Sequence, residues 1–141
     1  MHTFMRTLEI DAPANEVWRV LTTPELVREW AAVYLEGIQI RTSFREGEAV
    51  TWKTQSGEPR SWGTVAACRR DRLLRFEYDC DPRGASSETF EISELDHKTR
   101  LQLTTGALDR DHFEALKRPT QQVIEEIKSL AEESAQIHGV R

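Results

Sequence analysis

Hydrophobic and polar positions alternate with a period of two along most of the chain between residues 38 and 105. This period is typical of β-strands that bury one face. Clusters of turn-forming residues at 45–48, 55–59, 71–72, 81–84 and 96–98 separate the alternating runs. Together with a looser run near the N-terminus, the pattern predicts strands at 3–10, 38–44, 49–54, 62–69, 73–80, 86–95 and 99–105. Connections this short favour antiparallel hairpins over crossover helices.

Two short helices are expected between the first and second strands. Asp11 can cap the first helix, and Pro13 suits its first turn because proline has no N–H to leave unpaired. Thr23 can cap the second helix, which runs to Trp30.

A long amphipathic helix is predicted in the C-terminal part of the chain. From about Asp109 to Ile137, apolar residues recur every three or four positions while charged residues occupy the other side. Pro119 interrupts this pattern, so the helix either begins at Pro119 after a short turn or kinks there. We favour a helix that begins at Pro119, because proline costs little at a first helical position.

Length and charge limit the classes of function. The 141 residues fit a single domain spanning 1–141, and the net charge of −5 disfavours binding to nucleic acid or to an anionic membrane. The N-terminus lacks a signal-peptide pattern, and no run approaches the roughly 18 apolar residues that a membrane span requires. We therefore expect a cytoplasmic protein.

The residues that most often carry chemistry do not form a recognisable constellation. His2, His97, His112 and His138 are scattered and have no metal-ligand spacing, so we expect solvated histidines, no metal and no cofactor. The acidic run at 109–112 is interpreted as a helix cap. Reduced core thiols without a disulfide are expected for Cys68 and Cys80. Since no nucleophile–base pair or phosphate loop is visible, the sequence favours a binding protein over an enzyme.

The order of elements and several motifs support a family resemblance. The N-terminal part contains Ala12-Pro13, Glu16-Val17-Trp18, the stretch 21–25 (Leu-Thr-Thr-Pro-Glu) and Trp30. With one strand, two short helices, six strands and a long helix, the chain resembles the START-like (SRPBCC or Bet v 1-like) superfamily. Within it, the motifs resemble the family related to the C-terminal domain of the activator of Hsp90 ATPase. The resemblance implies an α+β helix-grip fold, with a curved six- to seven-stranded antiparallel sheet and one long C-terminal helix.

The resemblance also implies a cavity between the sheet and the C-terminal helix, near the second short helix. A small apolar or amphipathic ligand, such as a lipid, would be bound or carried there. Members commonly carry a tryptophan in the first turns of the terminal helix, and its absence from 119–123 predicts a wider or more polar cavity. The residues expected to line the cavity are Trp30, Trp52, Phe76, Tyr78, Glu88, Phe90, Thr120, Val123 and Ile127.

Two alternatives of other classes stay open. One is a cochaperone-like domain whose partner is a chaperone, as the family resemblance implies. The other is a cyclase- or dehydratase-like enzyme on the same fold, for which Glu88 or an inward-facing Arg6 would be the acid or base. Both a monomer and a homodimer are compatible with the sequence.

Overall fold

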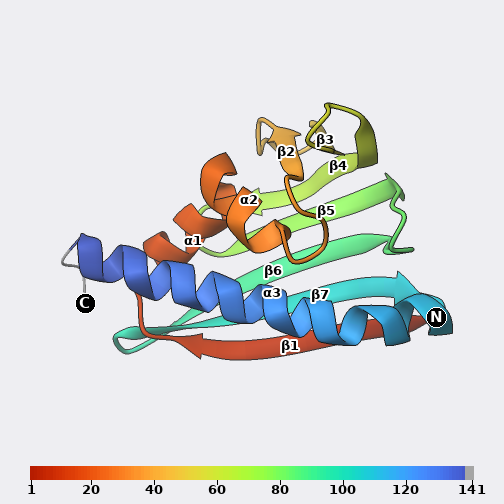
Figure 1. The fold of residues 1–141 in the computed structure, drawn as a ribbon. Coiled ribbons are helices and arrows are strands. Elements are labelled where there is room, and N and C mark those ends of the chain that lie inside the picture. Colours follow the sequence, from red (N-terminus) through yellow and green to blue (C-terminus); the bar gives the residue numbers. More distant parts are fainter. Residues whose placement is uncertain (139–141) are drawn as a thin grey trace.

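One antiparallel sheet of seven strands forms the frame of the protein (Figure 1). We describe it from a computed structural model, in which residues 1–138 are described. The strands follow the order β1-β7-β6-β5-β4-β3-β2 across the sheet. Their bounds are β1 His2–Ile10, β2 Gln39–Thr42, β3 Ala49–Lys53, β4 Pro59–Arg69, β5 Leu73–Cys80, β6 Ser87–Leu95 and β7 Lys98–Leu108. The strands alternate between buried and exposed residues, as the period of two predicts.

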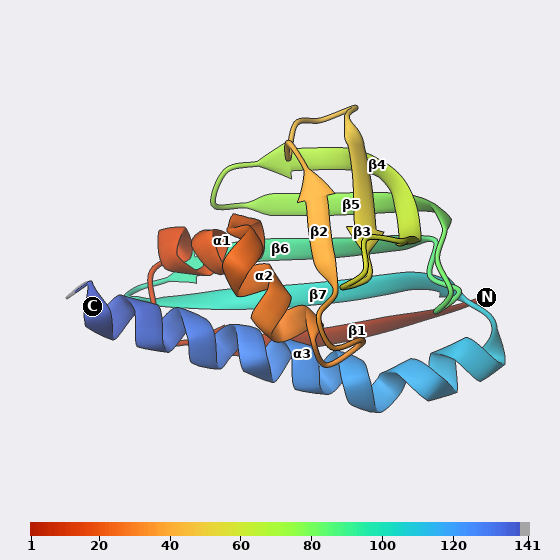
Figure 2. The same ribbon diagram turned by 45° about the horizontal axis from the view of Figure 1, so that its top comes forward.

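Three helices cover one face of this sheet. Helices α1 (Ala14–Thr22) and α2 (Pro24–Ala31) lie beside the long helix α3 (Arg110–Ile137), which runs along β1 and β7 (Figure 2). The buried side of α3 is a stripe formed by Leu116, Thr120, Val123, Ile124, Ile127, Ala131 and Ala135. The predicted α+β helix-grip fold is therefore confirmed, with a long helix across a curved antiparallel sheet.

The predicted start of the long helix at Pro119 is wrong. Helix α3 begins at Arg110, because the Asp109 side chain caps it by accepting a hydrogen bond from the His112 N–H at 2.9 Å. This confirms the interpretation of the acidic run as a cap. Leu116 adds a buried anchor before Pro119. Since Pro119 cannot donate to the carbonyl of Ala115, the helix continues with the bend that Figure 2 shows in its first third.

The predicted side-chain caps of the two short helices are also wrong. Pro13, with an extended backbone, occupies the N-cap position of α1, and Asp11 precedes it. The Asp11 main-chain N–H instead donates to the Glu132 carboxylate on α3 at 2.8 Å. Thr23 does occupy the N-cap position of α2, but its side chain makes no capping hydrogen bond.

The two cysteines are free, as expected, but neither is fully buried. Cys68 is half-buried and pairs in register with Leu74, while Cys80 is exposed at the end of β5. The expectation of core thiols is therefore corrected, because Cys68 packs only at the margin of the main core and Cys80 pairs with the exposed Trp62. Within residues 1–138, no helix combines the length and the hydropathy needed to cross a membrane.

At Gly63, strand β4 lies too close to the main chain of β5 to leave room for a side chain. A Cβ atom at this position would lie 2.0 Å from the main-chain oxygen of Glu77, beside an irregularity in the strand register. We expect Gly63→Ala to lower the free energy of unfolding by about 1–3 kcal/mol, because main-chain atoms of a central strand would have to move. Urea denaturation measures the loss.

The matched control for this change is Gly106→Ala. The nearest atom to a Cβ at Gly106 is the Thr3 side-chain oxygen, at 3.2 Å, and a side chain on an edge strand can rotate away. The loss for Gly106→Ala should therefore be clearly smaller, and equal losses for the two variants would contradict the close approach at Gly63.

Candidate ligand-binding site

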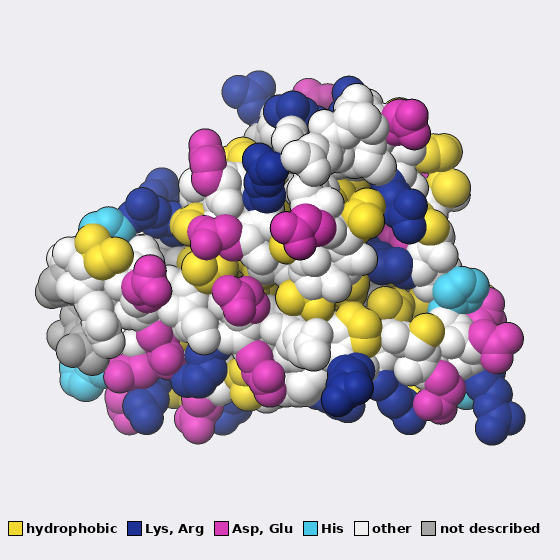
Figure 3. All heavy atoms as spheres, in the orientation of Figure 1, with side chains coloured by type: hydrophobic (Ala, Val, Ile, Leu, Met, Phe, Trp, Pro, Cys, Tyr) yellow, Lys and Arg dark blue, Asp and Glu magenta, His cyan; other side chains and the backbone are white. Residues whose placement is uncertain are grey.

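A cavity of about 110 Å³ lies between α2, the segment that follows it, and the far half of the sheet. Its apolar wall consists of Trp30, Ala31, Leu35, Ile38, Trp52 and Pro82. Its polar wall consists of Tyr34, Arg60, Ser61, Asp81, Arg83 and Glu88. Figure 3 shows hydrophobic and basic side chains next to each other over this part of the surface. Since none of the described α3 residues lines the cavity, its expected position against the C-terminal helix is corrected.

Two tryptophans from different elements form the apolar wall. Trp30, near the end of α2, is held by a hydrogen bond from its indole N–H to the main-chain oxygen of Val20 at 3.1 Å. Its ring meets that of Trp52 on β3 edge-on, with centroids 6.1 Å apart. The ring of Phe90 on β6 packs against the ring of Trp30, with centroids 5.8 Å apart. These rings are held by the core, so the wall is rigid before any ligand arrives.

The polar wall is built around the side chain of Arg83. Its Nε and Nη2 donate to the two oxygens of Asp81 at 3.0 and 2.6 Å, and its Nη1 donates to Glu88 at 3.0 Å. The Asp81 carboxylate has no exposed area, and that of Glu88 is 4% exposed. Burial opposes the charge of Arg83, but the two carboxylates outweigh it and raise the pKa of the guanidinium well above its ordinary value. The site therefore holds a permanent cation between two buried carboxylates.

The loop between β5 and β6 places Arg83 in this position. The Asp81 side chain accepts the main-chain N–H of Arg83 at 2.7 Å, which closes a tight turn. Gly84 follows with a φ of 79°, and a Cβ there would lie 2.6 Å from the ring of His112. Two reasons therefore favour glycine at position 84. Its φ is one that other residues rarely adopt, and a side chain would collide with His112 at the start of α3.

Two tyrosines connect the polar wall to the core. The Tyr78 hydroxyl donates to Glu88 at 2.6 Å and accepts from the Trp52 indole N–H at 2.9 Å. Arg83 stacks over the ring of Tyr34 at 4.5 Å. Burial, together with the charge of Glu88, raises the pKa of Tyr34 to about 12 and that of Tyr78 well above its ordinary value. Both hydroxyls are therefore protonated at neutral pH and act as hydrogen-bonding groups.

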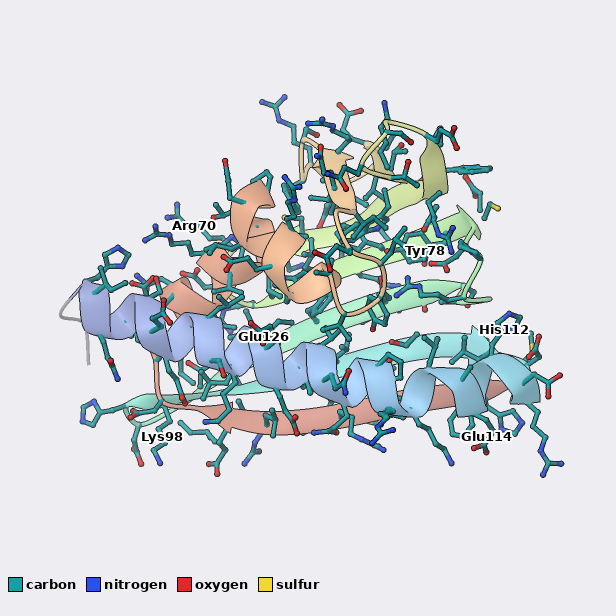
Figure 4. All side chains as sticks on the ribbon, in the orientation of Figure 1. Arg70, Tyr78, Lys98, His112, Glu114 and Glu126 are labelled. Atoms are coloured by element: carbon teal, nitrogen blue, oxygen red, sulfur yellow. The ribbon has the colours of Figure 1, made fainter. Side chains whose placement is uncertain are left out.

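The nine predicted site residues lie at three depths: in the cavity wall, directly behind the wall, and in the main core. Trp30, Trp52 and Glu88 line the cavity. Tyr78, labelled in Figure 4 beside the segment after α2, lies one layer behind and holds Glu88. Thr120 is fully buried and shares a hydrogen bond of 3.3 Å with the hydroxyl of Tyr34. The remaining four, Phe76, Phe90, Val123 and Ile127, are buried in the main core.

Sequence reasoning missed the residues that hold the polar wall together, which are Ser61, Asp81 and Arg83. They lie at the start of β4 and in the β5–β6 loop, where no periodic pattern gives the direction of a side chain. The available signal is the run Asp-Pro-Arg-Gly at 81–84, but its turn-forming residues predict only a loop. Arg6, the other candidate for an acid or base, is exposed at the sheet edge and lies over the ring of Phe4, so it does not face the cavity.

A second polar cluster joins α1 to the end of α3. Glu16 is buried and accepts from the Ser134 hydroxyl at 2.9 Å, and it lies 2.6 Å from the ring of His138. Burial alone would raise the pKa of Glu16, but the hydrogen bonds from His138 and Ser134 hold it below its ordinary value. The expectation of a solvated histidine at position 138 is therefore wrong. Among residues 1–138, no three His, Cys, Asp or Glu side chains are grouped as metal ligands.

Solved structures of other proteins have a similar architecture. The crystal structure of the protein MLL2253 from Mesorhizobium loti matches with a TM-score of 0.74 and 20% identity, covering 94% of this chain and 98% of that one. The solution structure of a protein from Cytophaga hutchinsonii matches with a TM-score of 0.73 and 19% identity, over 96% and 97% of the two chains. The solution structure of the Aha1 dimer from Colwellia psychrerythraea gives 0.73 and 13% identity, over 94% and 97%.

At these levels of identity, the structural matches support the fold. A search of curated protein sequences found no match. The family model described as "Activator of Hsp90 ATPase homolog 1-like protein" matches residues 11–132, which include both short helices, the whole cavity wall and most of α3. The chain therefore belongs to the family of proteins like the activator of Hsp90 ATPase homolog 1, within the START-like superfamily.

Proposed function

We propose that this protein binds a small amphipathic molecule in the cavity between α2 and the sheet. The observation that carries the proposal is the division of the cavity into an apolar wall with two fixed tryptophans and a polar wall in which Arg83 pairs with the buried carboxylates of Asp81 and Glu88. Ligand sites commonly combine apolar walls with a few fixed polar groups in this way.

The volume of the cavity limits the size of the ligand. A protein cavity of roughly 150 Å³ is large enough to hold benzene. At about 110 Å³, this cavity suits one ring or a short chain, with part of the ligand reaching the mouth beside the exposed Arg60. A whole lipid would not fit unless the segment after α2 moved.

Filling the cavity tests this function. Ala31 lines the cavity at the end of α2, and its neighbour Ala32 does not. We expect toluene and benzyl alcohol at millimolar concentration to shift the indole N–H signals of Trp30 and Trp52 in nuclear magnetic resonance spectra. Ala31→Leu should abolish these shifts, because three added carbon atoms occupy the ligand's space, and Ala32→Leu should keep them.

Native mass spectrometry of gently purified protein gives an independent readout, and a retained small molecule that disappears in Ala31→Leu would support the proposal. If neither probe shifts the indole signals and no mass is retained, the cavity is not a ligand site. The second candidate, contact with an Hsp90-type chaperone, rests on the family description and on the neighbour named as an Aha1 dimer. Binding to such a chaperone that Ala31→Leu leaves unchanged would favour it.

A further inference from the structure

We propose that the cavity selects an uncharged hydroxyl group, so that its ligand class is a small alcohol or phenol and not a carboxylate or an amine. This inference rests on the proposed function and concerns the polar end of the same ligand. It follows from counting which hydrogen-bonding positions of the polar wall are already in use.

The carboxylate of Asp81 has no capacity left. Two carboxylate oxygens offer about four acceptor positions. One oxygen of Asp81 accepts from the main-chain N–H and the Nε of Arg83, and the other accepts from the Nη2 of Arg83 and, at 3.4 Å, from Ser61. Asp81 therefore holds the loop and does not recognise a ligand.

Glu88, in contrast, is only half used. Among the described residues, it accepts one hydrogen bond from Tyr78 and one from Arg83, one on each oxygen. About two acceptor positions remain. The side chain is almost completely buried and lines the cavity, so these positions can be reached only from the cavity. Glu88 thus calls for a ligand group that donates a hydrogen bond.

Arg83 also has unused positions. Of the five N–H donors of a guanidinium, the described structure uses three, two on Asp81 and one on Glu88. One of the remaining two is on Nη1, the nitrogen that donates to Glu88 at 3.0 Å, and the other is on Nη2, which donates to Asp81. A free donor and a free acceptor therefore lie next to each other at the cavity wall. A hydroxyl group can satisfy both at once, because it donates one hydrogen bond and accepts others.

The charges of the site disfavour ionised ligands. Asp81 and Glu88 carry two negative charges against the single buried positive charge of Arg83, so an added anion would meet a net negative wall. Arg60 has a positive charge, but it is exposed at the mouth, where water screens it. An ammonium group could donate to Glu88, but it would lie beside Arg83 and has no lone pair for the free guanidinium donors.

Four probes of one shape test this inference on the unaltered protein. Benzyl alcohol, toluene, benzoate and benzylamine share a ring and differ in the group attached to it. At pH 7 and constant ionic strength, we expect benzyl alcohol to bind at least tenfold more tightly than each of the others. Hydrogen bonds to charged groups contribute about 1.5–3 kcal/mol, and 1.4 kcal/mol corresponds to tenfold in affinity. Nuclear magnetic resonance titration gives all four dissociation constants.

A pair of variants then assigns the preference to Glu88. Glu88→Gln keeps the size of the side chain but replaces half of its acceptor capacity with a donor, so the advantage of benzyl alcohol over toluene should fall below about threefold. Glu91 lies three positions further along β6 and is exposed on the other face, so Glu91→Gln should leave the advantage unchanged.

The outcomes separate this inference from the proposed function. Tightest binding of benzoate or benzylamine, or equal binding of toluene and benzyl alcohol, would overturn the choice of a hydroxyl while keeping the cavity as a ligand site. Failure of all four probes would overturn both. The probe series on the unaltered protein decides the question even if Glu88→Gln does not fold.

Discussion

Replacing Arg83 with methionine is expected to lower the free energy of unfolding by about 3–5 kcal/mol, as is typical when one partner of a buried ion pair is removed. Methionine keeps much of the length of the side chain but removes the cation that Asp81 and Glu88 share. Two buried carboxylates would then remain without a counter-charge. Urea denaturation at pH 7, followed by circular dichroism, measures the change.

Arg75→Met is the matched control for this variant. Arg75 lies on β5 with 40% of its side chain exposed, and it contacts Glu77 and Thr89 on the face away from the helices. Exposed pairs of this kind contribute about 0–1 kcal/mol, so its loss should be small. A loss for Arg83→Met no larger than that for Arg75→Met would show that the polar wall is not a coupled, buried network.

The second large effect is expected for Phe90→Ala, with a loss of about 3–5 kcal/mol, the usual range for removing a buried phenylalanine ring. Phe90 is 1% exposed and lies under Trp30 in the main core. The cavity left behind cannot collapse easily, because the rigid ring of Trp30 is tied to Val20. Chemical denaturation again gives the value.

Phe113→Ala provides the comparison for Phe90→Ala. Phe113 is half-buried and packs at the margin of a smaller cluster that contains Phe4 and Leu116. Surrounding solvent and side chains can fill the space there, so we expect a clearly smaller loss. If Phe113→Ala destabilised the protein more than Phe90→Ala, the smaller cluster and not the tryptophan-lined core would be the main source of stability.

Much of the fold was predictable because strands and helices leave regular patterns. The alternation of Glu88, Phe90 and Ile92 placed all three on the buried face of β6, and all three are buried. The position of Pro119 was not predictable in this way. A local preference placed it at a helix start, but the Asp109 cap and the buried Leu116 stabilise the turns before it. Packing and capping outweighed the propensity of one residue.

The site was less predictable than the fold, since its decisive groups depend on contacts between distant segments. Glu88 could be recognised from its strand, but its partner Arg83 lies in a loop whose shape depends on hydrogen bonds of the Asp81 side chain. The location of the cavity depends on how the segment after α2 crosses the sheet. No periodicity in the sequence encodes that crossing. The prediction therefore set the cavity against α3 as well as near α2, and of these two helices α2 alone contributes described residues to its wall.

The order of the strands has a consequence for how the protein is made. Within residues 1–138, β1 is hydrogen-bonded to β7 alone, with Leu8 opposite Leu101, so β1 has to wait for a partner strand that is synthesised after the five other strands of the sheet. Until then, β1 is an unpaired strand with a buried face exposed to water, which is open to wrong pairing. Such distant contacts also slow folding. The sheet therefore closes only after synthesis of β7, when Phe4 and Leu108 can meet beneath the start of α3.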